Sequence, residues 1–189
     1  MTEQKTDDRI GIYGYGSLLT DAGADIAPRI VQRLSFLSPW PIEYARSSRA
    51  WGDGPTLVIH HGGKPLRGEI LVLDVTSDHL REVRGWLRER EHNPPARCIK
   101  QMRMGALETV LYCALEDNIE KESLTPRLLA SLAIASVREK PEKNGIRYLR
   151  QNIERNLITP LTHAYRDEIL RHCGAKDLLV AETILLRSA

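Results

Sequence analysis

Short runs of β-branched and aromatic residues alternate with turn residues over the first 115 positions of the chain. Residues 10–15 form the first run, which breaks at glycines and therefore predicts a strand that enters a tight loop ending near Leu19. Residues 56–61 and 68–75 form two more runs, and the segment between them has the glycines and proline of a turn. These two runs are predicted to form a β-hairpin.

Three further runs complete the predicted sheet. Residues 36–46 can form a strand, but Pro39 and Pro41 cannot donate a backbone hydrogen bond, so we expect an edge strand or a bulge there. Residues 97–102 and 108–115 supply two more strands.

Helical spacing first appears after residue 76. Leu80, Val83 and Leu87 recur every three to four positions, which is the mark of an amphipathic helix. This helix is predicted to run to about Glu91, two residues before an Asn-Pro-Pro segment.

The remainder of the chain has a mostly helical pattern. Thr-Pro pairs at 125–126 and 159–160 predict two helix starts, and Gly174 predicts a helix end. Residues 177–186 fit either a strand or a helix. Because strands come first and helices dominate the end, the sequence predicts a single α+β domain over residues 1–189, with a curled mixed sheet or small barrel flanked by helices.

Composition and charge narrow the function classes. With 42% hydrophobic and 28% charged residues, the chain has the composition of an ordinary globular protein. The 27 basic residues nearly cancel the 25 acidic ones and form no dense run, so a nucleic-acid partner is not expected. The first nine residues are polar and no window approaches a membrane-spanning length, so we expect a cytoplasmic protein without a membrane partner.

The cysteines and histidines give no metal or disulfide pattern. Cys98, Cys113 and Cys173 are odd in number and widely spaced, which predicts free thiols in packed positions. His60 and His61 are adjacent, and neighbours on a strand point to opposite faces. No metal site is therefore expected.

The first candidate site is the loop at residues 14–19, Gly-Tyr-Gly-Ser-Leu-Leu. Glycines directly after a strand allow the backbone to approach a ligand and to direct amide hydrogens at an anion or a carbonyl. Leu19 stands where a dinucleotide-binding loop has glycine. Tyr15 and Leu19 stand where a serine hydrolase has glycines around its nucleophile, so Ser17 is a poor nucleophile. A tight turn without a ligand fits the same pattern.

The second candidate is Glu91. At about 100° per residue it lies roughly 40° from Leu87 on the predicted helix, whereas Glu89 falls on the far side. A carboxylate at the end of a core-facing stripe suits general acid or base chemistry. The alternative is that the helix frays here and Glu91 reaches water or pairs with Arg88 or Arg97.

These two segments resemble motifs of the γ-glutamylcyclotransferases, and the likeness continues over nearly the whole chain. Residues 86–91, Trp-Leu-Arg-Glu-Arg-Glu, are similar to the Tyr-Leu-x-x-Arg-Glu helix ending of the ChaC-type branch, which acts on glutathione. The resemblance puts the family's catalytic glutamate on Glu91. The segment that is similar to the family's Tyr-Gly-Ser loop consists of Tyr15, Gly16, Ser17 and Leu18.

Weaker similarities lie further along the chain. Residues 51–54, Trp-Gly-Asp-Gly, and residues 67–70, Arg-Gly-Glu-Ile, resemble segments around the family's next strands. Residues 141–145 followed by Tyr148 resemble its asparagine and tyrosine-leucine region. By resemblance, Gly54 and Tyr148 join the Tyr-Gly-Ser loop in binding substrate.

The resemblance implies a cofactor-independent γ-glutamylcyclotransferase that cyclises a γ-glutamyl amide or peptide, glutathione among them, to 5-oxoproline and releases the amine. Its partner is then a small γ-glutamyl molecule. Two alternatives stay open. One is a catalytically silent module that binds a small acid on the same fold, and the other is a thiol enzyme built on Cys98 or Cys113 with a histidine.

Overall fold

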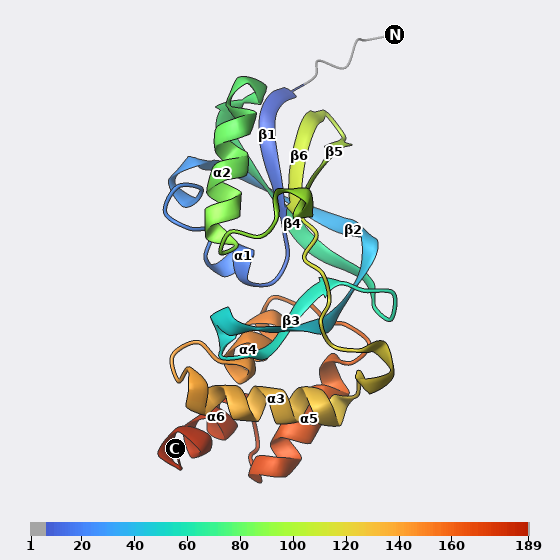
Figure 1. Cartoon of the computed structure of the whole chain (residues 1–189), viewed down its shortest axis with the longest axis vertical. Helices are drawn as coiled ribbons and strands as arrows, with labels where there is room; N and C mark the ends of the chain where they lie inside the picture. Colours follow the sequence, from blue (N-terminus) through green and yellow to red (C-terminus); the bar gives the residue numbers. More distant parts are fainter. Residues whose placement is uncertain (1–6, 189) are drawn as a thin grey trace. The chain divides into compact units, whose positions relative to one another are not determined.

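A computed structural model describes residues 7–188, and these form an α+β fold around a curled, mixed six-stranded sheet (Figure 1). The strand order is β3-β2-β4-β1-β6-β5. The strands are β1 (Asp7–Gly14), β2 (Ile30–Ser48), β3 (Gly54–Ile59), β4 (Lys64–Thr76), β5 (Ile99–Met104) and β6 (Leu107–Cys113). The helices are α1 (Ser17–Thr20), α2 (Leu80–Arg90), α3 (Pro126–Glu139), α4 (Gly145–Glu154), α5 (Thr162–Cys173) and α6 (Leu178–Arg187). The predicted fold class is confirmed.

The contacts divide the chain into two compact units, each of which is described by itself. Unit 1 comprises the chain up to Leu37 together with Arg67–Leu115. Unit 2 comprises Ser38–Leu66 and the chain from Glu116 onward. Two of the three boundaries between the units lie within the strands β2 and β4, and the third lies in the loop after β6.

In unit 1, β1 is the central strand. It pairs antiparallel with β4, where Tyr13 lies opposite Ile70, and parallel with β6, where Gly11 lies opposite Val110. The buried side chains Val83 and Leu87 belong to α2, which Figure 1 shows beside these strands. The spacing that predicted the amphipathic helix therefore marks its buried stripe, and α2 ends one residue before Glu91.

In unit 2, the helices α3, α4, α5 and α6 pack on one another, and α3 and α4 also contact β3 (Figure 1). Side-chain caps start three of these helices: Thr125 accepts from Leu128 N, and Asn144 and Asp177 act in the same way on α4 and α6. The last of these caps resolves the open alternative for residues 177–186, which are helical. The predicted helix end at Gly174 is confirmed, with φ 60° at that glycine.

The predicted hairpin of residues 56–61 and 68–75 is wrong, because β2 lies between β3 and β4 in the sheet. The true hairpin is β2–β3, in which Ser48 pairs with Gly54. The turn after β3 packs on β2: His60 N donates to Pro41 O over 3.0 Å, and a Cβ at Gly63 would lie 2.1 Å from Ile42 O. Turn residues identify a turn but not the strand that the returning chain pairs with.

Of the two alternatives for residues 36–46, the edge position is wrong, since β2 has a neighbour on both sides. A bulge or irregularity is present, because the register with β3 shifts between Glu43 and Arg46. The register with β3 begins at Ile42, just after Pro39 and Pro41. Pro41 still contributes its carbonyl, which accepts from His60 N.

The start of α5 differs from the prediction. The helix predicted to start at Thr159 begins at Thr162, whose side-chain oxygen lies 2.8 Å from Thr159 N.

Among residues 7–188, no helix is both long enough and apolar enough to cross a membrane.

Candidate functional site

The predicted ligand loop lies at the end of β1 and leads into the short helix α1. Gly16 has φ 65° and ψ −132°, a backbone conformation that residues other than glycine rarely adopt. Leu18 and Leu19 are buried, and a Cβ at Gly14 would lie 2.9 Å from the Leu18 side chain. The two leucine side chains therefore anchor the loop, and Ser17 beside them is half-buried.

Glu91 is the residue directly after α2. Its N–H donates to Leu87 O over 3.0 Å, so the helix does not fray before this position. The side chain is 15% exposed and forms an ion pair with Arg90, Oε1 to Nη1, at 2.5 Å. Glu91 is thus largely enclosed yet reachable, and its partner is Arg90 instead of Arg88 or Arg97.

Arg90 connects Glu91 to the loop. Its Nη2 donates to Ser17 Oγ over 3.1 Å, while Nε and Nη2 both donate to Asp21 O, over 2.9 and 2.7 Å. A planar guanidinium can hold several acceptors in fixed positions at once. Ser17, Arg90 and Glu91, which we call the loop–helix cluster, therefore form one hydrogen-bonded unit within unit 1.

Sequence reasoning identified two members of the loop–helix cluster and missed the third. Arg90 sits inside the segment that resembles the family motif, but neither periodicity nor composition indicated that its side chain reaches residues more than 60 positions earlier. Only the packing of α2 beside the loop shows it.

Arg90→Met is expected to lower the turnover of any reaction that uses Glu91 by about tenfold or more, with a smaller change in KM. The reason is that a displacement of a reacting group by about 1 Å can cost a large factor in rate. Steady-state kinetics on the proposed substrates measure this. Arg88→Met is the matched control because Arg88 is exposed and its Nε donates to Pro94 O. Equal kinetics of Arg90→Met and wild type would contradict the role.

Tyr15 continues an aromatic row along the strand. Its ring centroid lies 5.8 Å from that of Tyr13, which in turn lies 5.5 Å from Phe36 with the rings edge to face. The Tyr15 hydroxyl donates to Cys113 O over 3.4 Å. Tyr15 is half-buried, so its ring both fixes the loop to β6 and keeps part of its surface available.

Gly54 and Tyr148 belong to unit 2, where each packs against neighbouring residues of that unit. A Cβ at Gly54 would lie 2.6 Å from Gly145 Cα, so glycine is required where β3 meets the start of α4. Tyr148 is 3% exposed, and its hydroxyl accepts from Leu57 N over 3.2 Å. Its ring lies 4.7 Å from that of Trp51. Their predicted contact with substrate stays a prediction.

Unit 2 also holds a buried carboxylate that sequence reasoning missed. Glu43 has no exposed surface and accepts from Tyr44 N at 2.9 Å and from Leu161 N at 3.3 Å. Burial raises the pKa of Glu43, against the opposing effect of these hydrogen bonds. The sequence carries no signal for it, because a polar residue between apolar neighbours on a strand is expected to face solvent, whereas Ile42, Glu43 and Tyr44 are all buried.

The raised pKa of Glu43 predicts a stability that depends on pH. The folded state favours the protonated acid, so the stabilising contribution is present below the ordinary value of 4.5 and is lost as pH rises through the higher folded-state pKa. Glu43→Gln should therefore flatten the decline of the unfolding free energy above about pH 4.5. Urea unfolding at several pH values up to 7 measures this, and identical slopes in both proteins would refute it.

The two candidate thiols are at least half-buried. Cys98 is 6% exposed, which does not suit an accessible nucleophile, and Cys113 is half-buried at the end of β6. His60 is buried beside Asp117 in unit 2, with Nε2 and Oδ2 3.6 Å apart. Within residues 7–188, no three His, Cys, Asp or Glu side chains gather in a group that could hold a metal ion.

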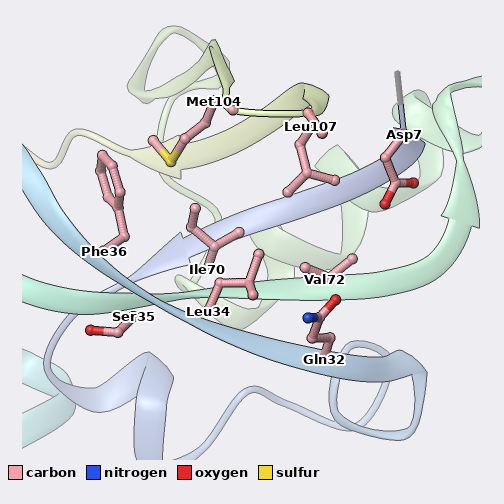
Figure 2. A pocket seen from close by; sticks show the side chains of 11 residues that line it. Asp7, Gln32, Leu34, Ser35, Phe36, Ile70, Val72, Met104 and Leu107 are labelled. Atoms are coloured by element: carbon pink, nitrogen blue, oxygen red, sulfur yellow. The ribbon is translucent and has the colours of Figure 1, made fainter. Parts of the chain in front are cut away.

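Unit 1 contains a pocket of about 370 Å³, which we call the sheet pocket (Figure 2). Its lining consists of Asp7, Gln32, Leu34, Ser35, Phe36, Ile70, Val72, Met104, Gly105, Ala106 and Leu107. None of the residues predicted from sequence to bind substrate belongs to this lining. The apolar walls and the carboxylate of Asp7 do not suit a γ-glutamyl group, which carries an α-carboxylate.

Comparison with known proteins adds no identification. Neither a scan against models of protein families nor a search of curated proteins found a match to this chain.

Proposed function

We propose that this protein is a γ-glutamylcyclotransferase whose reacting centre is the loop–helix cluster. The observation that supports the proposal is the contact chain from Ser17 through Arg90 to Glu91. It joins a glycine-containing loop, suited to holding a small acid, to a largely enclosed carboxylate suited to proton transfer. Both groups lie in the same compact unit.

The reaction is intramolecular. Glu91 takes a proton from the α-ammonium group of the γ-glutamyl substrate, and the free amine attacks its own γ-carbonyl. A new carbon–nitrogen bond closes the five-membered ring, and Glu91 returns its proton to the leaving nitrogen as the bond to that nitrogen breaks. The ring nitrogen then gives up its second proton, which passes through Glu91 to the released amine. The products are 5-oxoproline and an amine, an amino acid or a dipeptide, so protons and electrons balance without a cofactor.

The remaining residues of the site have supporting roles. Backbone N–H groups around Gly16, Ser17 and Leu18 bind the substrate carboxylate or the oxyanion that develops on the γ-carbonyl, where one well-placed donor is worth about 3 kcal/mol. Arg90 fixes the position of the Glu91 carboxylate relative to the loop. Because the substrate supplies its own nucleophile, the protein needs mainly to fold the substrate and to move protons.

The direct test is release of 5-oxoproline by the purified protein from glutathione, γ-glutamyl-alanine and a γ-glutamyl-amine. Release from any of them above the uncatalysed rate is the expected result, and the preferred donor identifies the leaving group. A folded protein that is inactive on all three contradicts the proposal.

One observation favours a second candidate, a catalytically silent module that binds a small acid. The Glu91 carboxylate is already engaged by Arg90, which would compensate its charge if no proton transfer were required. Calorimetric titration distinguishes the two functions: a protein that binds γ-glutamyl-alanine without releasing 5-oxoproline is the module.

A further inference from the structure

We propose that the sheet pocket is a second ligand site, which binds a small uncharged aromatic molecule. The proposal does not depend on the cyclotransferase reaction, because no residue of the loop–helix cluster lines the pocket. Its volume of about 370 Å³ lies in the lower part of the range of pockets that hold small molecules.

The walls of the sheet pocket are apolar and come from three parts of unit 1. Figure 2 shows side chains from β2, from β4 and from the ends of β5 and β6 around the same space, and the apolar ones are Leu34, Phe36, Ile70, Val72, Met104 and Leu107. Burying the body of an apolar ligand against such walls is the main source of its binding free energy.

The electrostatics favour an uncharged ligand. Asp7 is the charged residue of the lining, and its carboxylate accepts from Arg9 Nε over 2.9 and 3.0 Å and from Arg9 N over 3.1 Å. These hydrogen bonds lower the pKa of Asp7 and compensate its charge. A cation would have to compete with Arg9, and an anion would meet a carboxylate. Gln32, an exposed residue of the lining, can exchange a hydrogen bond with a hydroxyl or amide group of a neutral ligand.

The apolar walls are held in place before any ligand arrives. Phe36 is fixed by its edge-to-face contact with Tyr13. Ile70 and Leu107 are buried and pack over Gly11, where an added Cβ would lie 2.7 Å from Ile70 and 3.4 Å from Leu107. A preformed wall lowers the ordering cost of binding.

Two side chains select for an aromatic ring. Phe36 and Met104 are only half-buried on this side, so a ring edge and a thioether are both available for contact. Aromatic pairs and sulfur–aromatic contacts each add stabilisation beyond simple burial. Gly105 and Ala106 also line the pocket, and Gly105 has no atom within 4 Å of a built Cβ, which leaves room for a ligand beside Met104.

The test uses 2-naphthol as the neutral probe, with 2-naphthoate and 2-naphthylmethylammonium as charged analogues. The full-length protein is titrated with each probe, and amide chemical shifts are followed by NMR. Saturable binding of 2-naphthol is expected, with the largest shifts at residues 34–36, 70–72 and 104–107. The two charged analogues should bind at least fivefold more weakly.

Leu34→Lys and Leu37→Lys form a matched pair of variants. Both residues lie on β2 in unit 1, but Leu34 lines the pocket, whereas Leu37 is 50% exposed and does not. Leu34→Lys should weaken 2-naphthol binding at least tenfold, and Leu37→Lys should change it less than twofold. Unchanged circular dichroism and melting temperature show that each variant is folded.

Three results would overturn the proposal: no saturable binding of 2-naphthol to wild type, shifts centred on residues outside the lining, or equal weakening by the two variants. Glu91→Gln should leave 2-naphthol binding unchanged. The pocket can therefore fail while the cyclotransferase activity stands, and the activity can fail while the pocket stands.

Discussion

Glu91→Gln should abolish 5-oxoproline release, with a loss of about 10²-fold to 10⁴-fold in turnover. Glutamine keeps the size of the side chain and one oxygen that can accept from Arg90, but it cannot take a proton from the substrate ammonium. General acid–base catalysis by a positioned side chain contributes a factor of this order. KM should change little, because the loop that holds the glutamyl carboxylate is intact.

Glu89→Gln is the matched control for this experiment. Glu89 lies two residues earlier, at the end of the same helix, and its side chain is exposed. The same chemical change there should leave kcat and KM within about twofold of wild type, as is usual for surface substitutions. Full activity of Glu91→Gln would show that another group moves the proton and that the choice of Glu91 was wrong.

The second large effect is expected on stability, from Gly54→Ala. The added Cβ would lie 2.6 Å from Gly145 Cα, 2.7 Å from Gly145 N and 2.9 Å from Trp51 O. All three are backbone atoms, so no flexible side chain can give way. Overpacking of this kind costs about 3 kcal/mol of unfolding free energy, which corresponds to a melting temperature lower by roughly 6–12 °C.

Gly85→Ala provides the opposite control. Gly85 lies inside α2, and a built Cβ there has no atom within 4 Å. Alanine should therefore stabilise the protein by about 1 kcal/mol through its higher helix propensity. If Gly54→Ala instead keeps the stability of wild type but raises KM for a γ-glutamyl substrate, Gly54 contacts the ligand and the packing role is refuted.

The sequence by itself determined the features that depend on local spacing. The stripe of Leu80, Val83 and Leu87 located α2, because an amphipathic helix repeats its buried positions every three to four residues. Capping chemistry likewise located the start of α3 at Thr125 and the end of α5 at Gly174. The α+β class followed from the order of strands and helices along the chain.

Tertiary structure alone decided which strands are neighbours. The runs that form β3 and β4 are consecutive and joined by turn residues, yet β2 lies between them. A turn restricts the local backbone, whereas pairing depends on contacts made by residues far apart in sequence. The edge position expected from Pro39 and Pro41 was wrong for the same reason, because whether a missing N–H matters depends on the partner strand.

The same distinction between local sequence patterns and long-range contacts applies to the candidate site. Helical phase and the loop pattern identified Glu91 and Ser17, since each depends on residues within one or two turns. The link between them, Arg90, reaches back across 73 positions to Ser17, and the sheet pocket assembles lining residues from five strands. Contacts over such separations are set by how the sheet curls and how α2 packs beside it, and no local pattern in the sequence encodes them.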